Sequence, residues 1–275
     1  MINNYDSFDA CYSSGSTTSQ KQGDASYTAK KRTWLSFLTV FVALLSFVFT
    51  QGQSTANYAF STNATGSLAL DANANAIDMS TGSALLVAAG SDQGVSAITN
   101  IGFNYYFFGN VFSQFSVSAN GILQLGPTAV SGSTYVTSGG TTAAPKFSAI
   151  GSDAITASTG DGGGITSKVV GTSPNRCLVV QWVSYLYWLN TASPATFQVR
   201  LYETSGVVEY VYGSMPVGAS AYSSNYSSGF SAGTLANQLA CITTSTNVVS
   251  TSTFTTNAYT AATNRNFTLS SRTFT

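Results

Sequence analysis

The chain contains only two glutamates, Glu203 and Glu209, both in the segment "YETSGVVEY". Two carboxylates across a cleft, one of them with a raised pKa, are the groups that hydrolyse glycosidic bonds. Asp153 and Asp161 flank a loop and are the other candidates for such a pair. Alternation along a hairpin, however, predicts that Glu203 and Glu209 point to opposite faces. A glycan-active enzyme with an acid pair is therefore the third of our hypotheses.

Other catalytic patterns are weaker still. The sequence has no histidine, which removes the commonest general base and the commonest metal ligand. A serine or cysteine nucleophile would need Lys146 or Lys168 as its base, and neither lies in a recognisable catalytic pattern. The glycine run at 158–168 lacks the G-x-x-x-x-G-K-[ST] signature of a phosphate loop. We expect no catalytic residue and no cofactor.

Calcium is the one metal to consider. Asp153, Asp161 and nearby carbonyls offer the hard oxygen ligands that Ca²⁺ takes. The simpler interpretation, which we favour, is that both aspartates are solvated turn residues.

Aromatic residues suggest a second kind of site. Tyr185, Tyr187 and Trp188 lie close together in "VSYLYW", and Tyr105 and Tyr106 in "NYYFFG". Rings exposed together would form a flat platform for sugars, whereas strand alternation would bury one set in the core. We favour the core, and keep carbohydrate binding as the alternative function.

The two cysteines after residue 52 are Cys177 and Cys241. An oxidising compartment would permit a disulfide between them, and buried thiols are the other reading. We favour buried thiols slightly.

The pattern after residue 55 consists of short alternating or apolar runs separated by Gly, Asn, Ser and Thr clusters. Such a pattern is typical of a sandwich or barrel. It predicts an all-β, two-sheet, jelly-roll-like sandwich over residues 53–275, with candidate strands at 66–70, 83–88, 103–108, 114–119, 121–125, 164–170, 176–185, 196–203, 207–212, 238–244 and 266–271.

One hairpin can be predicted in detail. If Ser205-Gly206 is a two-residue turn, Tyr202 faces Glu209 and Arg200 faces Val211. Arg200 and Glu209 are then diagonal neighbours on an exposed face, where an ion pair sets register and contributes under ~1 kcal/mol.

Structural roles are also expected for residues at strand ends. Pro174-Asn175 is predicted to be a turn, with Arg176 at the mouth of the next strand and Asp153 as its guessed partner. Asn120 and Gly121, between two candidate strands, are assigned structural roles as well.

The N-terminal part resembles an export segment. Residues 1–29 are a polar extension, and 30–52 combine Lys30–Arg32 with an apolar run at 34–49 and a candidate cleavage site before Gln53. We expect a cleaved signal peptide, or a single-span anchor through 34–49, with the remainder outside the cytoplasm.

Charge limits the partners. Residues 53–275 carry seven acidic and six basic side chains, and no basic patch of the kind that binds nucleic acid. We expect other surface or matrix proteins or glycans as partners, no nucleic acid, membrane contact only through 34–49, and room for self-association.

A family resemblance is carried by three segments in order: "FSVSANGILQLG" (115–126), "GTSPNRCLVVQW" (171–182) and "FQVRLYETSGVVEYVYG" (197–213). Together they resemble a β-sandwich module of secreted and cell-surface Bacteroidetes proteins. That module is often N-terminal in adhesin-like, type IX-secreted proteins and has no defined enzymatic activity. This chain keeps only Asp153 where the family tends to have paired aspartates, and has Cys177 at a usually aliphatic position. The resemblance implies an exported, non-catalytic structural or adhesion module.

Overall fold

The computed structural model describes residues 58–63, 66–135, 144–186, 190–215, 224–233, 239–243, 246, 248–250, 257–259 and 271–274. Side chains are described for most but not all of these residues. The predicted export segment at 30–52 and the extension at 1–29 lie outside these ranges. No helix within the described ranges has the length and apolar character needed to cross a membrane.

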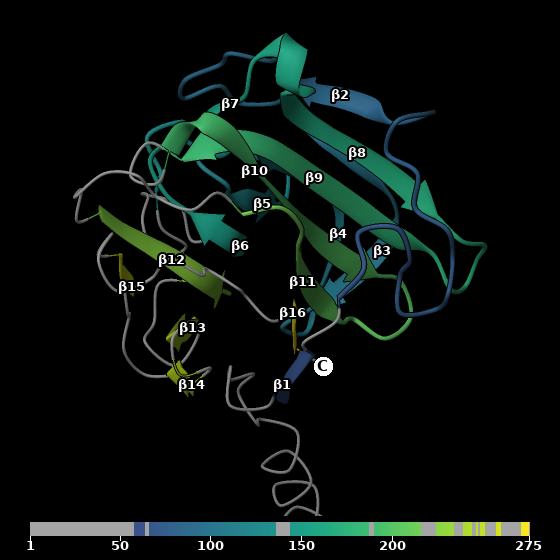
Figure 1. The fold of residues 1–275 in the computed structure, drawn as a ribbon. Coiled ribbons are helices and arrows are strands. Elements are labelled where there is room, and N and C mark those ends of the chain that lie inside the picture. Colours follow the sequence, from purple (N-terminus) through teal and green to yellow (C-terminus); the bar gives the residue numbers. More distant parts are fainter. Residues whose placement is uncertain are drawn as a thin grey trace, which may run out of the picture. The chain divides into compact units, whose positions relative to one another are not determined.

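Two antiparallel sheets make up the described part of the chain (Figure 1). The first contains, in spatial order, β1 (Phe60–Asn63), β16 (Ser271–Phe274), β11 (Val208–Tyr212), β10 (Asn190–Tyr202), β9 (Cys177–Leu186), β8 (Gly164–Val170) and β2 (Ala84–Val87), with β7 (Ala154–Thr156) paired to β9. The second contains β14 (Val248–Ser250), β13 (Leu239–Thr243), β12 (Ser224–Ser231), β6 (Lys146–Gly151), β5 (Leu123–Leu125), β4 (Asn110–Val117) and β3 (Thr99–Phe107), with β15 (Asn257–Tyr259) paired to β12. A single 3-10 turn, η2 (Thr159–Asp161), is the helical element of the described ranges. The predicted all-β, jelly-roll-like sandwich is confirmed.

The core lies between the two sheets and is rich in aromatic rings. Trp182 of β9 is fully buried, stacks on Phe197 of β10 at 5.5 Å between ring centroids, and donates its indole N–H to the Ser118 carbonyl. In the other sheet, Phe107 and Phe147 meet edge to face at 4.8 Å. Buried rings of this size supply most of the apolar area that stabilises a sandwich.

Part of the outward face of the first sheet is also buried. Residues 66–83, here called the strap, run across it and lead the chain to β2. Ile77 and Met79 of the strap pack on Val170, Cys177 and Val179, a second apolar cluster. Where the strap crosses, outward residues such as Cys177 and Val179 of β9 and Gln198 and Arg200 of β10 are therefore as buried as the core-facing residues between them.

A loop covers part of the second sheet in the same way. Gln124 and Ser116 point outward from β5 and β4 and are buried. Gln124 donates to the Thr128 carbonyl at 2.7 Å, and the Ser116 hydroxyl accepts the Val130 N–H at 2.8 Å. Buried polar side chains thus hold loops over both sheets by bonding to loop backbone, which would otherwise lose its hydrogen bonds.

Most predicted strands occur with shifted ends. The segment 164–170 coincides with β8, and 176–185 is displaced by one residue from β9. The predicted strand at 66–70 is wrong, because those residues belong to the strap and form only an isolated bridge at Leu70. Of the predicted last strand at 266–271, only Ser271 is described, and it begins β16.

Candidate functional site

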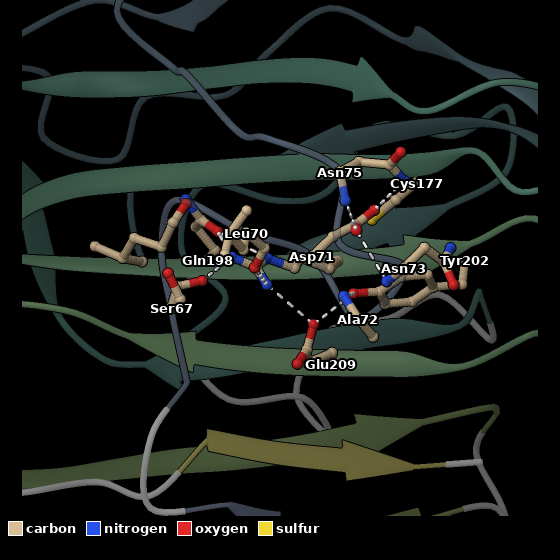
Figure 2. A network of polar contacts seen from close by, with 12 residues as sticks. Ser67, Leu70, Asp71, Ala72, Asn73, Asn75, Cys177, Gln198, Tyr202 and Glu209 are labelled. Carbon is tan, nitrogen blue, oxygen red and sulfur yellow. Dashed lines mark hydrogen bonds and ion pairs between the residues drawn. The ribbon is translucent and has the colours of Figure 1, made fainter.

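The most elaborate polar site lies between the strap and the first sheet, around Arg200 of β10 (Figure 2). The Arg200 side chain is 1% exposed. Its guanidinium donates to the carbonyls of Ser67 and Leu70 at 2.5 and 2.9 Å, and to Oε1 of Gln198 at 2.8 and 2.6 Å. It also pairs with Oε2 of Glu209 at 3.1 Å. A buried charge needs such complete pairing, and the planar fork of arginine reaches several acceptors at once.

Glu209 connects this guanidinium to Tyr202. The Tyr202 hydroxyl donates to Oε2 of Glu209 at 2.6 Å and accepts the Ala72 N–H at 2.9 Å. Burial raises the pKa of Tyr202, so the hydroxyl keeps its proton and remains a donor. On the other side, Gln198 donates to Gln181 at 2.8 Å and to the Leu68 carbonyl at 3.3 Å.

Asp71 shapes the strap beside this network. One carboxylate oxygen accepts the N–H groups of Asn73 and Asn75 at 2.9 and 2.7 Å, and the other accepts the Asn75 amide at 2.9 Å. Both carboxylate oxygens therefore accept hydrogen bonds from within the strap, in an Asx-type turn that fixes the conformation of the strap over the sheet.

The hairpin carrying Arg200 and Glu209 differs from its prediction. The Tyr202 N–H donates to the Val207 carbonyl, so the loop has four residues, 203–206, and Gly206 takes φ +66°. Arg200 consequently lies directly opposite Glu209, not Val211. The expectation of an exposed pair is also wrong, because the strap covers it.

The second ion pair joins Arg176 to Glu203 and explains the longer loop. Nε of Arg176 donates to Oε2 at 2.8 Å and Nη2 to Oε1 at 2.5 Å, a two-bonded fork. Hydrogen bonds from Arg176 lower the pKa of Glu203. The guessed Arg176–Asp153 contact is wrong, since the hairpin loop brings Glu203 to Arg176 by a tertiary contact that the local pattern does not encode.

Arg176 also ties the two sheets together. Its Nη1 donates to the Gly102 carbonyl of β3 at 2.9 Å, and its guanidinium lies 5.4 Å from the centre of the Phe103 ring. A small polar pocket of about 140 Å³ adjoins the pair; it is lined by Asn73, Asn175, Arg176, Tyr202, Glu203, Thr204 and Ser205.

The strand-end residues lie in turns. Asn175 donates its N–H to the Thr172 carbonyl at 2.8 Å, and the Ser173–Pro174 peptide is cis. Asn120 is fully buried, and its Oδ1 accepts the Ala154 N–H at 3.0 Å. Gly121 has φ +79°, and a Cβ there would lie 1.8 Å from the Ile150 carbonyl oxygen, so only glycine fits.

The calcium candidates are not part of an acidic cluster. Within the described ranges no three His, Cys, Asp or Glu side chains come together as a metal site. The Asp161 carboxylate accepts hydrogen bonds from Tyr185 and Ser158, which lower its pKa. Asp153 is exposed at its turn, and partial burial together with the charge of Asp92 raises its pKa.

The cysteines and aromatic candidates are placed as follows. Cys177 and Cys241 are both buried and are not joined in a disulfide, so the disulfide alternative is wrong. Burial raises the pKa of the Cys177 thiol. Of the proposed sugar platform, Tyr185 is half-buried and bonded to Asp161, while Tyr187 and Trp188 lie outside the described residues.

Sequence reasoning missed the strap and the residues that hold it, chiefly Gln198, Tyr202 and Asp71. Gln198 and Arg200 alternate with apolar residues in β10, which is typical of an exposed face. The one available signal was the low overall charge of 7%, which makes a wholly solvated arginine face unusual.

Comparison with known proteins identifies the family of this chain. No curated protein and no solved structure matches the chain. The NIDO-related family, a family of extracellular-type domains, matches residues 52–274, a range that contains every strand of both sheets. The chain therefore belongs to the NIDO-related family.

Proposed function

We propose that the chain is an exported, non-catalytic sandwich that serves as a structural or adhesion module at the cell surface or in an extracellular matrix. Its partners are other surface or matrix proteins or glycans. Residues 30–52 direct its export, either as a cleaved signal or as an anchor. Membership of the NIDO-related family, whose domains are of extracellular type, supports this role.

The observation that carries the proposal is that the few charged side chains of the first sheet form structural hydrogen bonds and ion pairs. Arg200 and Glu209 are bonded to the strap and its sheet, and Arg176 and Glu203 are bonded to one another and to β3. A general acid for glycan hydrolysis needs a raised pKa, whereas the pKa of Glu203 is lowered by its arginine. Both arginines donate to backbone carbonyls and both glutamates pair with those arginines, which supports a mechanical rather than a chemical role.

The test is localisation followed by loss of function in the organism that encodes the chain. An epitope in the full chain should be reached by antibody and by protease on intact cells. Deletion of residues 53–275 should reduce adhesion or cohesion, while glycan hydrolysis by the purified chain stays at background. Retention inside the cell, or turnover of a glycan that Glu203→Gln abolishes, would contradict the proposal.

Carbohydrate binding is a second candidate because of Tyr106 on β3. Its ring is 58% exposed and lies opposite the exposed Val111, with the exposed Asn104 on the same side of the strand. A free ring face beside an amide matches the apolar and hydroxyl faces of a sugar. Binding on a glycan array that Tyr106→Ala removes and Val111→Ala retains would support this candidate.

A further inference from the structure

β2 is one of the two edge strands of the first sheet, at the opposite end of its order from β1 (Figure 1). β2 pairs with β8 on one side, and on the other side the described residues offer it no strand. An edge strand presents N–H and C=O groups to any chain that can pair with them. Soluble proteins usually protect such edges with lysine, proline or a covering loop, yet residues 83–90, "SALLVAAG", contain no charge and no proline.

In the second sheet, the edge strand β3 is protected against pairing with another chain. Along the edge strand β3, Arg176 donates to the Gly102 carbonyl, and Gly206 lies next to the Tyr106 carbonyl. The N–H of Phe108, just after the strand, donates to the Tyr58 hydroxyl at 3.0 Å. Loops and side chains therefore occupy the β3 edge at several points. At β2 such contacts begin only after the strand, where the Ala88 carbonyl accepts the Thr156 hydroxyl at 2.7 Å and the Gly90 N–H donates to the Thr156 and Ala157 carbonyls, and residues 84–87 themselves have none among the described contacts.

Leu85 makes the β2 edge apolar as well as open. Its side chain is 65% exposed, the highest value among the large apolar side chains that the structure describes. The register between β2 and β8 shifts between Leu85 and Val87, and Leu86 and Val87 turn toward the core. Leu85 is thus left exposed at the rim of the sheet, beside the open backbone edge of β2, where a pairing strand would cover it.

We propose that β2 pairs antiparallel with β2 of a second copy of this chain, so that the first sheet continues across a two-fold axis. In such an isologous contact each residue faces its own strand, and any charge near the axis would meet a like charge. Residues 83–90 contain none, and residues 53–275 are close to neutral, so neither local nor overall charge opposes the pairing. Pairing centred on Leu85 brings the two leucines side by side on one face and buries both.

The contact is small because β2 has four residues. An interface of this size falls in the class of weak, transient contacts and becomes populated where copies are concentrated. The inference rests on the proposed surface role, because many copies held close together on a cell surface or in a matrix reach the local concentration that a weak contact needs. It names homotypic sheet extension as the way in which the modules cohere.

The test is sedimentation of the purified full chain between about 10 µM and 1 mM, a range suited to weak interfaces. The wild type should show a monomer–dimer equilibrium. Leu85→Lys should raise the dissociation constant at least ~30-fold, because two partly buried leucines are lost and two like charges face each other. Val111→Lys is the matched control: Val111 is 52% exposed but lies in β4, between two other strands, and should leave the equilibrium unchanged.

Hydrogen exchange gives the second readout and keeps the test independent of folding. Amides of residues 84–87 should become more protected as the wild-type concentration rises, and should not do so in Leu85→Lys with an unchanged melting temperature. Monomeric wild type at 1 mM would overturn the inference, as would association that Leu85→Lys leaves intact. A surface-exposed but monomeric chain would refute β2 pairing alone, whereas a chain retained inside the cell would refute the proposed function alone.

Discussion

Replacing Arg200 with methionine should destabilise the sandwich by about 3 kcal/mol. Removing one member of a buried ion pair typically costs about 3–5 kcal/mol, because the remaining charge stays buried without its partner. The Glu209 side chain is 15% exposed, so water can reach it in part, and the lower end of that range applies. For a domain of this size, a loss of about 3 kcal/mol lowers the melting temperature by about 6–12 °C.

Thermal and urea unfolding of Arg200→Met, compared with Lys168→Met, provide the assay. Lys168 also donates to strap carbonyls, those of Asp78 and Thr81 at 2.8 Å, but from a partly exposed position. Its removal should therefore cost under ~1 kcal/mol. The double variant Arg200→Met/Glu209→Gln should recover part of the loss, since no carboxylate charge is then left unpaired.

A local readout separates this reasoning from a general packing defect. Amides at the strap positions bonded to Arg200 should exchange faster in Arg200→Met, while those of the core strands keep their order of protection. The account of the strap would be refuted if Arg200→Met were no more destabilising than Lys168→Met, or if strap exchange did not change.

Three further predictions concern turns and surface charges. In a double-mutant cycle read by melting temperature, Arg176→Met and Glu203→Gln should show non-additive losses, because each side chain is the other's partner in the two-bonded fork; additive losses would argue against the fork. Gly121→Ala should lower the free energy of unfolding by at least ~2 kcal/mol more than Gly162→Ala. Both glycines have positive φ, but only Gly121 lacks room for a Cβ. Equal losses in urea unfolding would be inconsistent with that clash. Hydrogen bonds, chiefly from Ser80, lower the pKa of Asp78 to about 2, so its stabilising contribution should be complete above pH ~4 and be lost as the pH falls toward 2. Asp78→Asn should make the fall in melting temperature over that interval shallower, since Glu203 and Asp161 still contribute to it, and an unchanged pH profile would count against the bonded carboxylate.

Strand content was predictable because apolar alternation reports burial on one face. β8 and β9 follow it closely, since Ile165, Trp182 and their neighbours face the core at every second position. β6 and β12 escaped prediction because neither is a run of large apolar residues: "KFSAIG" includes a lysine, a serine and a glycine, and "SNYSSGFS" is rich in serine. Ser148, Ser227, Ser228 and Ser231 are buried, so polarity did not indicate exposure there.

The partners of the charged residues were not predictable from local spacing. Counting from Ser205-Gly206 placed Arg200 opposite Val211, whereas it lies opposite Glu209. Glu203 belongs to the longer loop and bonds to Arg176, which lies 27 positions earlier. Arg200 in turn bonds to carbonyls more than a hundred positions away in the strap. Long-range contacts of this kind decide both the loop length and the burial of the pair, and a single sequence carries no sign of them.

The strap also changes where this sandwich can accumulate mutations. In most β-sandwiches the outward positions of a sheet drift freely, because water accepts nearly any polar side chain. Here Gln198, Arg200 and Tyr202 occupy such positions but are enclosed. A saturation mutagenesis screen for folding should find them as intolerant of substitution as Phe197 and Val199. Tolerance of substitution along β10 should therefore not alternate from residue to residue, although polar and apolar residues alternate in its sequence.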